Sequence, residues 1–148
     1  MKQEDKNLLV KDLCARLPYG VMVREGTVLY DDKNTTSYRV KKLSYVHIGK
    51  CFSRIKGFIH DYEYIYIPYL FPLSSMTEEQ EEEFKNLYYR YHESAFFFNE
   101  RFSYDRYSIK DIGFYPCYLQ DWLNKNHFDY RGLIEKGLAI DATELNIY

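Results

Sequence analysis

Hydrophobic and polar positions change their spacing along the chain, and the first spacing is that of a helix. Between residues 3 and 17, leucines recur every four positions at Leu9, Leu13 and Leu17, and Lys, Asp and Glu fill the other face. A repeat of three to four residues is typical of an amphipathic helix with one face toward a core. Pro18 follows and is expected to end the helix. The spacing therefore predicts an N-terminal helix over residues 3–17.

From about residue 21 the spacing shortens to alternate positions, which is typical of strands. Short strands with short connections favour an antiparallel meander of four or five strands, and such a meander can curl into a small SH3-like barrel. The first two expected strands cover residues 21–24 and 27–30, around a turn at Glu25-Gly26. A long strand is expected over 38–48, with a bulge near Lys41-Lys42, and a shorter one between Gly49 and Gly57. The last strand covers 63–67, and Pro68 and Pro72 end the β region.

The second half of the chain predicts two or three helices. Thr77 is a good N-cap and Gln80 completes a capping box, ahead of an acidic run that the helix dipole stabilises. The apolar stripe of this helix is formed by Phe84, Leu87, Tyr88, Tyr91, Ala95 and Phe98. A second helix is expected from Pro116 to about Asn126, with Leu119, Trp122 and Leu123 buried, and a short third one over 130–136, closed by Gly137.

Length and composition place these elements in one α+β domain. The chain has 148 residues, of which 46% are hydrophobic, which is enough for a single core. The domain spans residues 1–148, with a β-rich half over about 1–72 and a helical half over about 73–148. Seventeen Tyr and ten Phe predict either a thick, semi-polar core or a sticky exposed surface.

The sequence predicts a cytoplasmic protein that is not in the membrane. No apolar run approaches the roughly 20 residues needed to span a bilayer, and the first residues, with their acidic side chains, do not have the pattern of a signal peptide. Cys14, Cys51 and Cys117 are odd in number and far apart, which fits a reducing compartment. All three are expected to be buried as small hydrophobic residues.

Charge is distributed unevenly, although the net charge is only −2. Residues 33–60 contain no Asp or Glu and seven cations, which leaves the other residues with 13 basic and 22 acidic side chains, or −9. Aromatic residues lie between these cations, as single-stranded nucleic acid requires for stacking and phosphate pairing; a nucleotide would need the same cations gathered in a pocket. The candidate ligand-binding residues are Arg39, Lys41, Lys42, Tyr45, Lys50, Arg54 and Lys56.

Two structural explanations of this basic segment remain open. Cations at a sheet edge discourage strands of different molecules from pairing. Alternatively, the segment faces the acidic start of the helix that follows Thr77, within one chain or across a homodimer. A sequence pI near 6.1 also weakens the nucleic-acid hypothesis, because dedicated binders are usually basic overall.

No catalytic or metal-binding motif is present, so we predict no metal and no cofactor. The four histidines lie at no ligand spacing, and no phosphate-binding loop or nucleophile elbow occurs. Only residues 121–132 are dense in reactive types. There His127, Asp129 and Arg131 form a weak candidate acid/base site, with His as the base and Arg holding an anion. A polar network at a joint between elements explains the same residues without chemistry.

Three stretches of the chain carry a resemblance to a set of proteins. They are KDLCARLPYGV at residues 11–21, PYLFPLSSMTEEQ at 68–80 and DWLNKNHFDYRGLIEKGLA at 121–139. In these stretches the chain resembles small proteins encoded by gut Bacteroidetes and by their phages and mobile elements. The resemblance implies an accessory gene of a phage or resident element, and it implies no activity and no functional residue.

Together these observations favour a non-enzymatic binding or interaction protein of phage or mobile-element origin. Its partner is a nucleic acid, a nucleotide or a host protein, and surplus aromatic residues also favour a homodimer. One alternative is nucleic-acid or nucleotide binding through the basic 33–60 segment. The other is an enzyme of unknown type with a site around His127.

Overall fold

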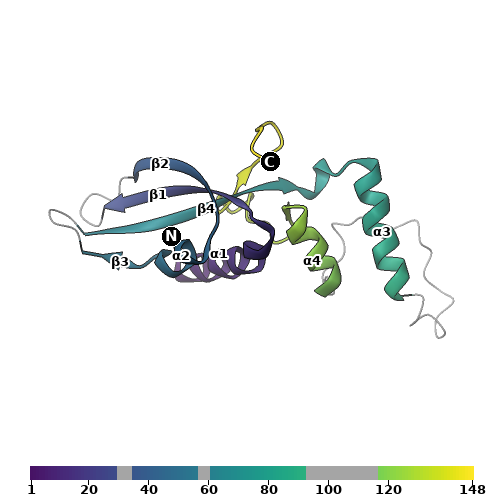
Figure 1. The fold of residues 1–148 in the computed structure, drawn as a ribbon, viewed down its shortest axis with the longest axis horizontal. Helices are drawn as coiled ribbons and strands as arrows, with labels where there is room; N and C mark the ends of the chain where they lie inside the picture. The colour runs from purple at the N-terminus through teal and green to yellow at the C-terminus, as the bar shows by residue number, and fades with distance from the viewer. Residues whose placement is uncertain (30–34, 57–60, 93–116) are drawn as a thin grey trace.

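The computed structural model describes residues 1–29, 35–56, 61–92 and 117–148. Within them the chain forms an elongated α+β molecule, with a twisted sheet toward one end and a pair of helices toward the other (Figure 1). The elements are α1 Gln3–Arg16, β1 Met22–Leu29, β2 Thr35–Lys42, α2 Tyr45–Lys50, β3 Arg54–Ile55, β4 Tyr62–Pro72, α3 Glu78–His92, α4 Cys117–Lys125, β5 Phe128–Asp129 and β6 Ile140–Asp141.

The sheet is mixed and open, with β4 at its centre. Four strands lie in the order β2-β1-β4-β3, all antiparallel, and the short strands β5 and β6 pair parallel with the last residues of β4. An antiparallel meander was the expectation, but β4 returns to pair with β1 over seven residue pairs instead of following β2. The sheet does not close into a barrel, because β2 and β3 are its two edge strands and do not pair with each other.

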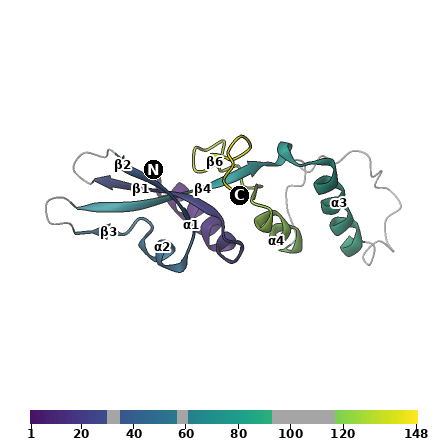
Figure 2. The same cartoon turned by 45° about the horizontal axis from the view of Figure 1, so that its top comes forward.

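Helices α1 and α2 cover one side of this sheet (Figures 1 and 2). The main core lies between them and the strands. There Leu9 and Leu13 of α1, both fully buried, pack with Val23 and Tyr66 of the sheet. A second core joins α3 to α4 and β5, where the rings of Phe84 and Trp122 lie 5.4 Å apart. The expected N-terminal helix is therefore present, and its leucine stripe faces the sheet.

Several local expectations about the β region are wrong. β1 runs without interruption through Glu25 and Gly26, where a turn was expected, because β2 and β4 pair with it on both sides at these positions. The expected long strand ends at Lys42, and the residues after it form α2. Ser44 and His47 make the capping box of that helix, so a local polar signal ends the strand. β4 also continues through Pro68, which lies opposite Val23 at the end of the β1 pairing.

The helices of the second half agree better with the sequence. Thr77 and Gln80 form the expected capping box, with hydrogen bonds of 3.0 and 3.2 Å between each backbone N–H and the other side chain. In α4, Leu119 and Leu123 are fully buried and Trp122 nearly so, as expected. The outer part of the α3 stripe, at Ala95 and Phe98, lies outside the described residues, as does Pro116, and the side chain of Tyr91 is not described.

The third expected helix, over residues 130–136, is absent. This segment forms consecutive turns that end at Gly137, whose φ of 68° is the left-handed value expected of it. The carboxylate of Asp129 accepts hydrogen bonds from the backbone N–H groups of Leu133 and Ile134, which fixes the turns without a helical ladder.

The cysteines are also placed differently from the expectation. Only Cys51 is buried, whereas Cys14 and Cys117 are exposed, and all three are free thiols. Burial raises the pKa of Cys51 to about 11, so this thiol is inert.

Candidate functional site

The side of the sheet away from α1 and α2 is a candidate binding surface. Side chains alternate across a strand, so with Val23 and Tyr66 facing the helices, their neighbours face the other way. Arg24 of β1 lies between Val40 of β2 and Ile67 of β4, and Gly26 lies between Tyr38 and Ile65. We call the surface formed by Arg24, Tyr38, Val40, Ile65 and Ile67 the open side.

Apolar side chains on the open side are exposed. Tyr38 is 59% exposed and Val40 is 52% exposed, while Ile65 and Ile67 are half-buried. No described helix covers them (Figure 2). Neighbouring exposed apolar residues of this kind are typical of a surface that contacts another molecule.

Arg24 adds a cation to this surface. Its guanidinium carbon lies 4.7 Å from the centre of the Tyr38 ring, a cation–π geometry that holds the ring against the sheet. Its Nε is buried and has no hydrogen-bond partner among the described residues. Tyrosine and arginine are the residue types that interfaces favour.

The predicted basic residues do not gather on one surface. Arg39, Lys41 and Lys42 lie on β2, at one edge of the four antiparallel strands, and Arg54 lies on β3, at the opposite edge. Lys56 follows β3 and is exposed. Tyr45, 82% exposed, and Lys50 lie at the two ends of α2, on the covered side. Lys33, which contributes to the seven cations, lies outside the described residues.

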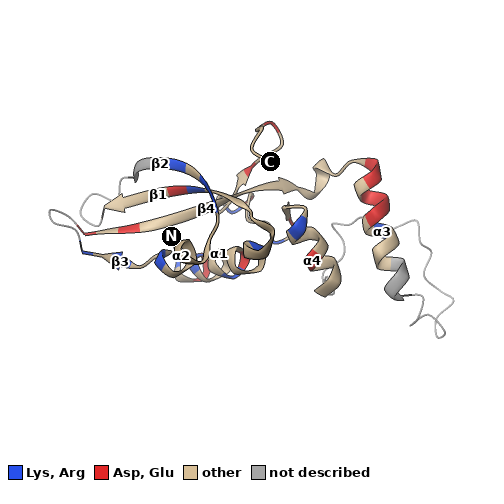
Figure 3. Ribbon diagram, viewed as in Figure 1, with Lys and Arg blue, Asp and Glu red and all other residues tan. Residues whose placement is uncertain are grey.

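Carboxylates from outside the basic segment pair with two of these cations. Lys41 Nζ lies 2.7 Å from Glu25 Oε1, and Arg54 Nη2 lies 2.6 Å from Asp61 Oδ2. The acidic start of α3 is at the far end of the molecule and does not face β2 or β3 (Figure 3). The segment therefore supplies one basic edge at β2 and separate cations elsewhere, which is less than a nucleic-acid surface needs.

Beneath the sheet, Glu25 is the centre of a polar cluster that sequence reasoning missed. Burial opposes its ionisation, but hydrogen bonds from Lys41 and Tyr66 outweigh this and hold the pKa of Glu25 below its ordinary value. The ring of His47 stacks on Tyr66 at 5.1 Å, and burial, with Lys41 and Lys50 nearby, lowers the pKa of His47. His47 Nδ1 accepts the N–H of Ser44. The cluster fastens α2 to β1 and β4.

The weak catalytic candidates are engaged with three different partners. His127 stacks on Tyr148 with ring centres 4.2 Å apart. Asp129 accepts backbone N–H groups of the turn that follows it. Arg131 Nη1 lies 2.7 Å from Asp12 Oδ1, on α1. No hydrogen bond among the described residues joins the imidazole to either of the other two side chains, so the geometry favours the structural explanation.

Asp12 and Arg16 form a buried ion pair that was not predicted from the sequence. Both side chains are fully buried, with Arg16 Nε 2.7 Å from Asp12 Oδ2 and Arg16 Nη2 2.8 Å from the carbonyl oxygen of Phe128. With Arg131 they make a triad that ties α1 to β5. Their spacing from Leu9 and Leu13 is that of the buried stripe, which is the signal that identifies them.

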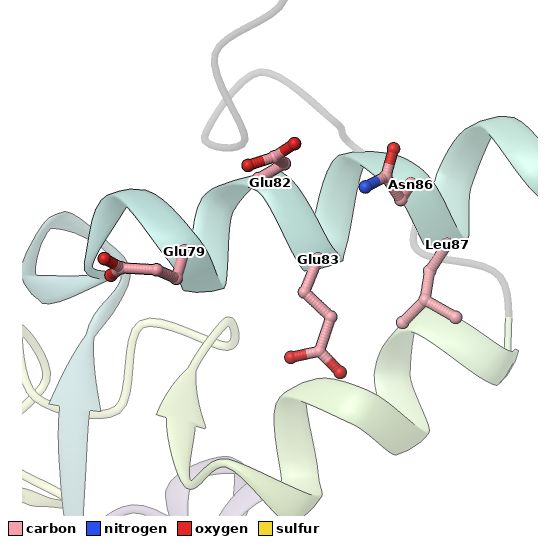
Figure 4. A pocket seen from close by; sticks show the side chains of 5 residues that line it. All are labelled: Glu79, Glu82, Glu83, Asn86 and Leu87. Carbon is pink, nitrogen blue, oxygen red and sulfur yellow. The ribbon is translucent and has the colours of Figure 1, made fainter.

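A shallow hollow of about 430 Å³ lies along α3 (Figure 4). Its described lining comes from this one helix: Glu79, Glu82, Glu83, Asn86 and Leu87. Hydrogen bonds from backbone N–H and from Thr77 lower the pKa of Glu79, which is the ordinary effect of a helix start on a carboxylate. Among the residues that the structure describes, no group of His, Cys, Asp and Glu is arranged to hold a metal ion.

No helix in the described parts of the chain combines the length and apolar character needed to cross a bilayer.

Comparisons of the chain with protein-family models, with curated proteins and with solved structures found no match. The geometry is therefore the basis for a functional proposal.

Proposed function

We propose that this chain is a non-enzymatic interaction protein that binds a protein partner on the open side of its sheet. The observation that carries the proposal is the exposure of Tyr38 and Val40 on the same side of a four-stranded sheet as half-buried Ile65 and Ile67. Burying an exposed Tyr and Val contributes favourable free energy at about 25 cal/mol per Å². The strands present these side chains at fixed positions, which lowers the entropic cost of association.

A protein partner fits the open side better than a nucleic acid does. A single strand of nucleic acid needs several cations along one track, with aromatic rings between them. Here two of the predicted cations are engaged by carboxylates, and those of β2 and β3 lie at opposite edges of the sheet. The apolar positions of β2 and β4, in contrast, lie on one side of the sheet, on either side of β1. Phage or mobile-element origin and a cytoplasmic location belong to the same proposal and depend on the sequence alone.

Site-specific photo-crosslinking tests the proposal. A photoreactive phenylalanine analogue replaces Tyr38 on the open side, and in a matched variant it replaces Tyr45, which is more exposed and lies on the covered side. In the cells that make the protein, we expect a discrete protein adduct from position 38 and none from position 45. Adducts of equal yield from both positions, adducts to nucleic acid, or no adduct from position 38 would contradict the proposal.

A further inference from the structure

The free edge of β2 borders the open side. Within the described ranges, β2 pairs only with β1. The N–H of Leu43 donates to the carbonyl oxygen of Val21, and in an antiparallel ladder the residues that point toward the partner strand recur at every second position. Lys41 and Arg39 therefore direct their main-chain groups to β1. Tyr38, Val40 and Lys42 direct theirs to the free edge.

The charged residues of β2 are all positive. β2 carries Arg39, Lys41 and Lys42, and Arg24 lies on the adjoining strand. The carboxylate within the ladder is Glu25, which Lys41 and Tyr66 already engage. A second copy of this chain paired through β2 would set like charges opposite each other, which destabilises a strand pair. An acidic strand would instead find Arg39 and Lys42, which form no ion pair among the described residues, whereas Glu25 already engages Lys41.

Protection against aggregation is not a sufficient explanation of these cations. A protected edge keeps apolar side chains away from its rim, yet Tyr38 and Val40 are both more than half exposed on it. A strand added here would set its alternate residues beside these two side chains, and the residues between them beside Arg39 and Lys41. The edge therefore favours a partner strand in which apolar and charged residues alternate.

We propose that the partner contributes an extended acidic segment that adds to β2 as a further strand. Its carboxylates lie on the side of β2 that carries Arg39, the cation of that side that Glu25 does not engage. Its apolar side chains lie beside Tyr38 and Val40 and extend the open side. Main-chain hydrogen bonds to Val40 and its edge neighbours supply affinity, and the alternation supplies specificity. This inference rests on the proposed function and names the chemistry of its partner.

The test uses the full chain and three fluorescent heptapeptides with blocked ends. The first is Glu-Val-Glu-Tyr-Glu-Val-Glu, the second has Lys in place of Glu, and the third has the composition of the first with all Glu residues placed before the apolar ones. We expect the alternating acidic peptide to bind about tenfold more tightly than either control, since strand addition needs both the charge and the order. Its affinity falls with salt.

Variants at Val40 separate edge pairing from contact with the face. Val40→Pro removes an N–H that β1 does not use, so the fold tolerates it better than a proline at Lys41, and peptide binding should fall about tenfold. Val40→Thr keeps the N–H and a β-branched shape, and it should bind within about threefold of the wild type. Arg39→Glu should weaken the acidic peptide and strengthen the Lys peptide. Thermal unfolding of each variant verifies that it is folded.

The outcomes distinguish the two proposals. If the crosslink from position 38 forms but the acidic peptide binds no better than its controls, or binds equally to Val40→Pro, the acidic-strand inference is wrong and the proposed function stands. If light scattering shows a dimer that Val40→Pro dissociates, the occupant of the edge is a second copy, which also overturns the inference. If the crosslink fails, the proposed function itself is wrong.

Discussion

Charged groups have different environments on the two sides of the sheet. On the covered side, the charged groups of Asp12, Arg16 and Glu25 are enclosed and engaged by one another or by neighbours such as Lys41. On the open side and at its edge, the guanidinium of Arg24 lies over the exposed ring of Tyr38, and Lys42 is exposed at the end of β2. A buried charge that loses its partner is costly, whereas an exposed one stays hydrated. Substitutions on the covered side should therefore change stability, and those on the open side should change binding.

The buried triad gives the largest expected effect. Asp12→Asn removes the carboxylate that Arg16 and Arg131 share, which leaves two guanidinium groups close together without an anion. We expect the free energy of unfolding to fall by about 3–5 kcal/mol, measured by urea unfolding. Glu4→Gln, an exposed carboxylate on the same helix, serves as the control and should change it by about 0.5 kcal/mol or less. A small loss at Asp12 would contradict the contrast between the two sides.

His127 makes stability depend on pH. Burial and the nearby Arg16 lower the pKa of His127 to about 4 in the folded chain, from 6.5 in the unfolded chain. The neutral ring is thus favoured by folding, so its contribution is complete above pH 6.5 and is lost as the pH falls toward 4. The loss is on the order of 2 kcal/mol, allowing for a partly hydrated ring.

Unfolding curves at several pH values measure this effect. His127→Asn tolerates the left-handed backbone at this position, where φ is 60°, and should remove the part of the pH dependence between 6.5 and 4. If the free energy of unfolding depends on pH equally in the wild type and the variant, groups other than His127 cause that dependence.

The polar cluster around Glu25 gives a smaller expected effect. Tyr66→Phe removes the hydroxyl that donates to this carboxylate, while Lys41 remains as its partner. We expect a loss of about 1 kcal/mol in the free energy of unfolding. Tyr45→Phe is the matched control, because its side chain is exposed and its hydroxyl should contribute nothing measurable. Equal losses in both variants would show that the cluster does not stabilise the fold.

The smallest expected effect on stability comes from the open side. Tyr38→Ser and Val40→Thr, tested singly, should each change the free energy of unfolding by about 0.5 kcal/mol or less, because both side chains are exposed. In the peptide experiment, Tyr38→Ser should nonetheless weaken binding. A loss of stability as large as that at Tyr66 would mean that the open side is covered by another part of the chain.

Local signals explain the parts of the fold that the sequence predicted correctly. The leucine stripe of α1, the capping box at Thr77 and the buried face of α4 each depend on residues within a few positions of one another. The strand order depends on contacts between distant residues, such as Arg24 with Ile67. Alternation along one strand cannot identify its neighbour, so the meander was the simplest expectation, and it was wrong.

The candidate site shows the same division. Composition identified the cations of residues 33–60, and alternation identified β2, but only the pairing of strands separates Arg39 from Arg54. Asp12 and Arg16 share the spacing of the buried stripe, but the hydrogen bond from Arg16 to the carbonyl oxygen of Phe128 joins residues more than a hundred positions apart. Such a hydrogen bond forms only in the folded chain, when segments that are distant in the sequence come into contact.

The sequence by itself determined the α+β class, the positions of three helices and an acid-free, aromatic segment. Periodicity and capping determine these features because they act through neighbouring residues. Tertiary structure alone decided that Lys41 is neutralised by Glu25, that β2 is left with a free edge, and that Tyr38 and Val40 remain exposed beside it. The physical reason is that pairing and burial belong to two segments at once, and the pattern of either segment alone does not identify the other.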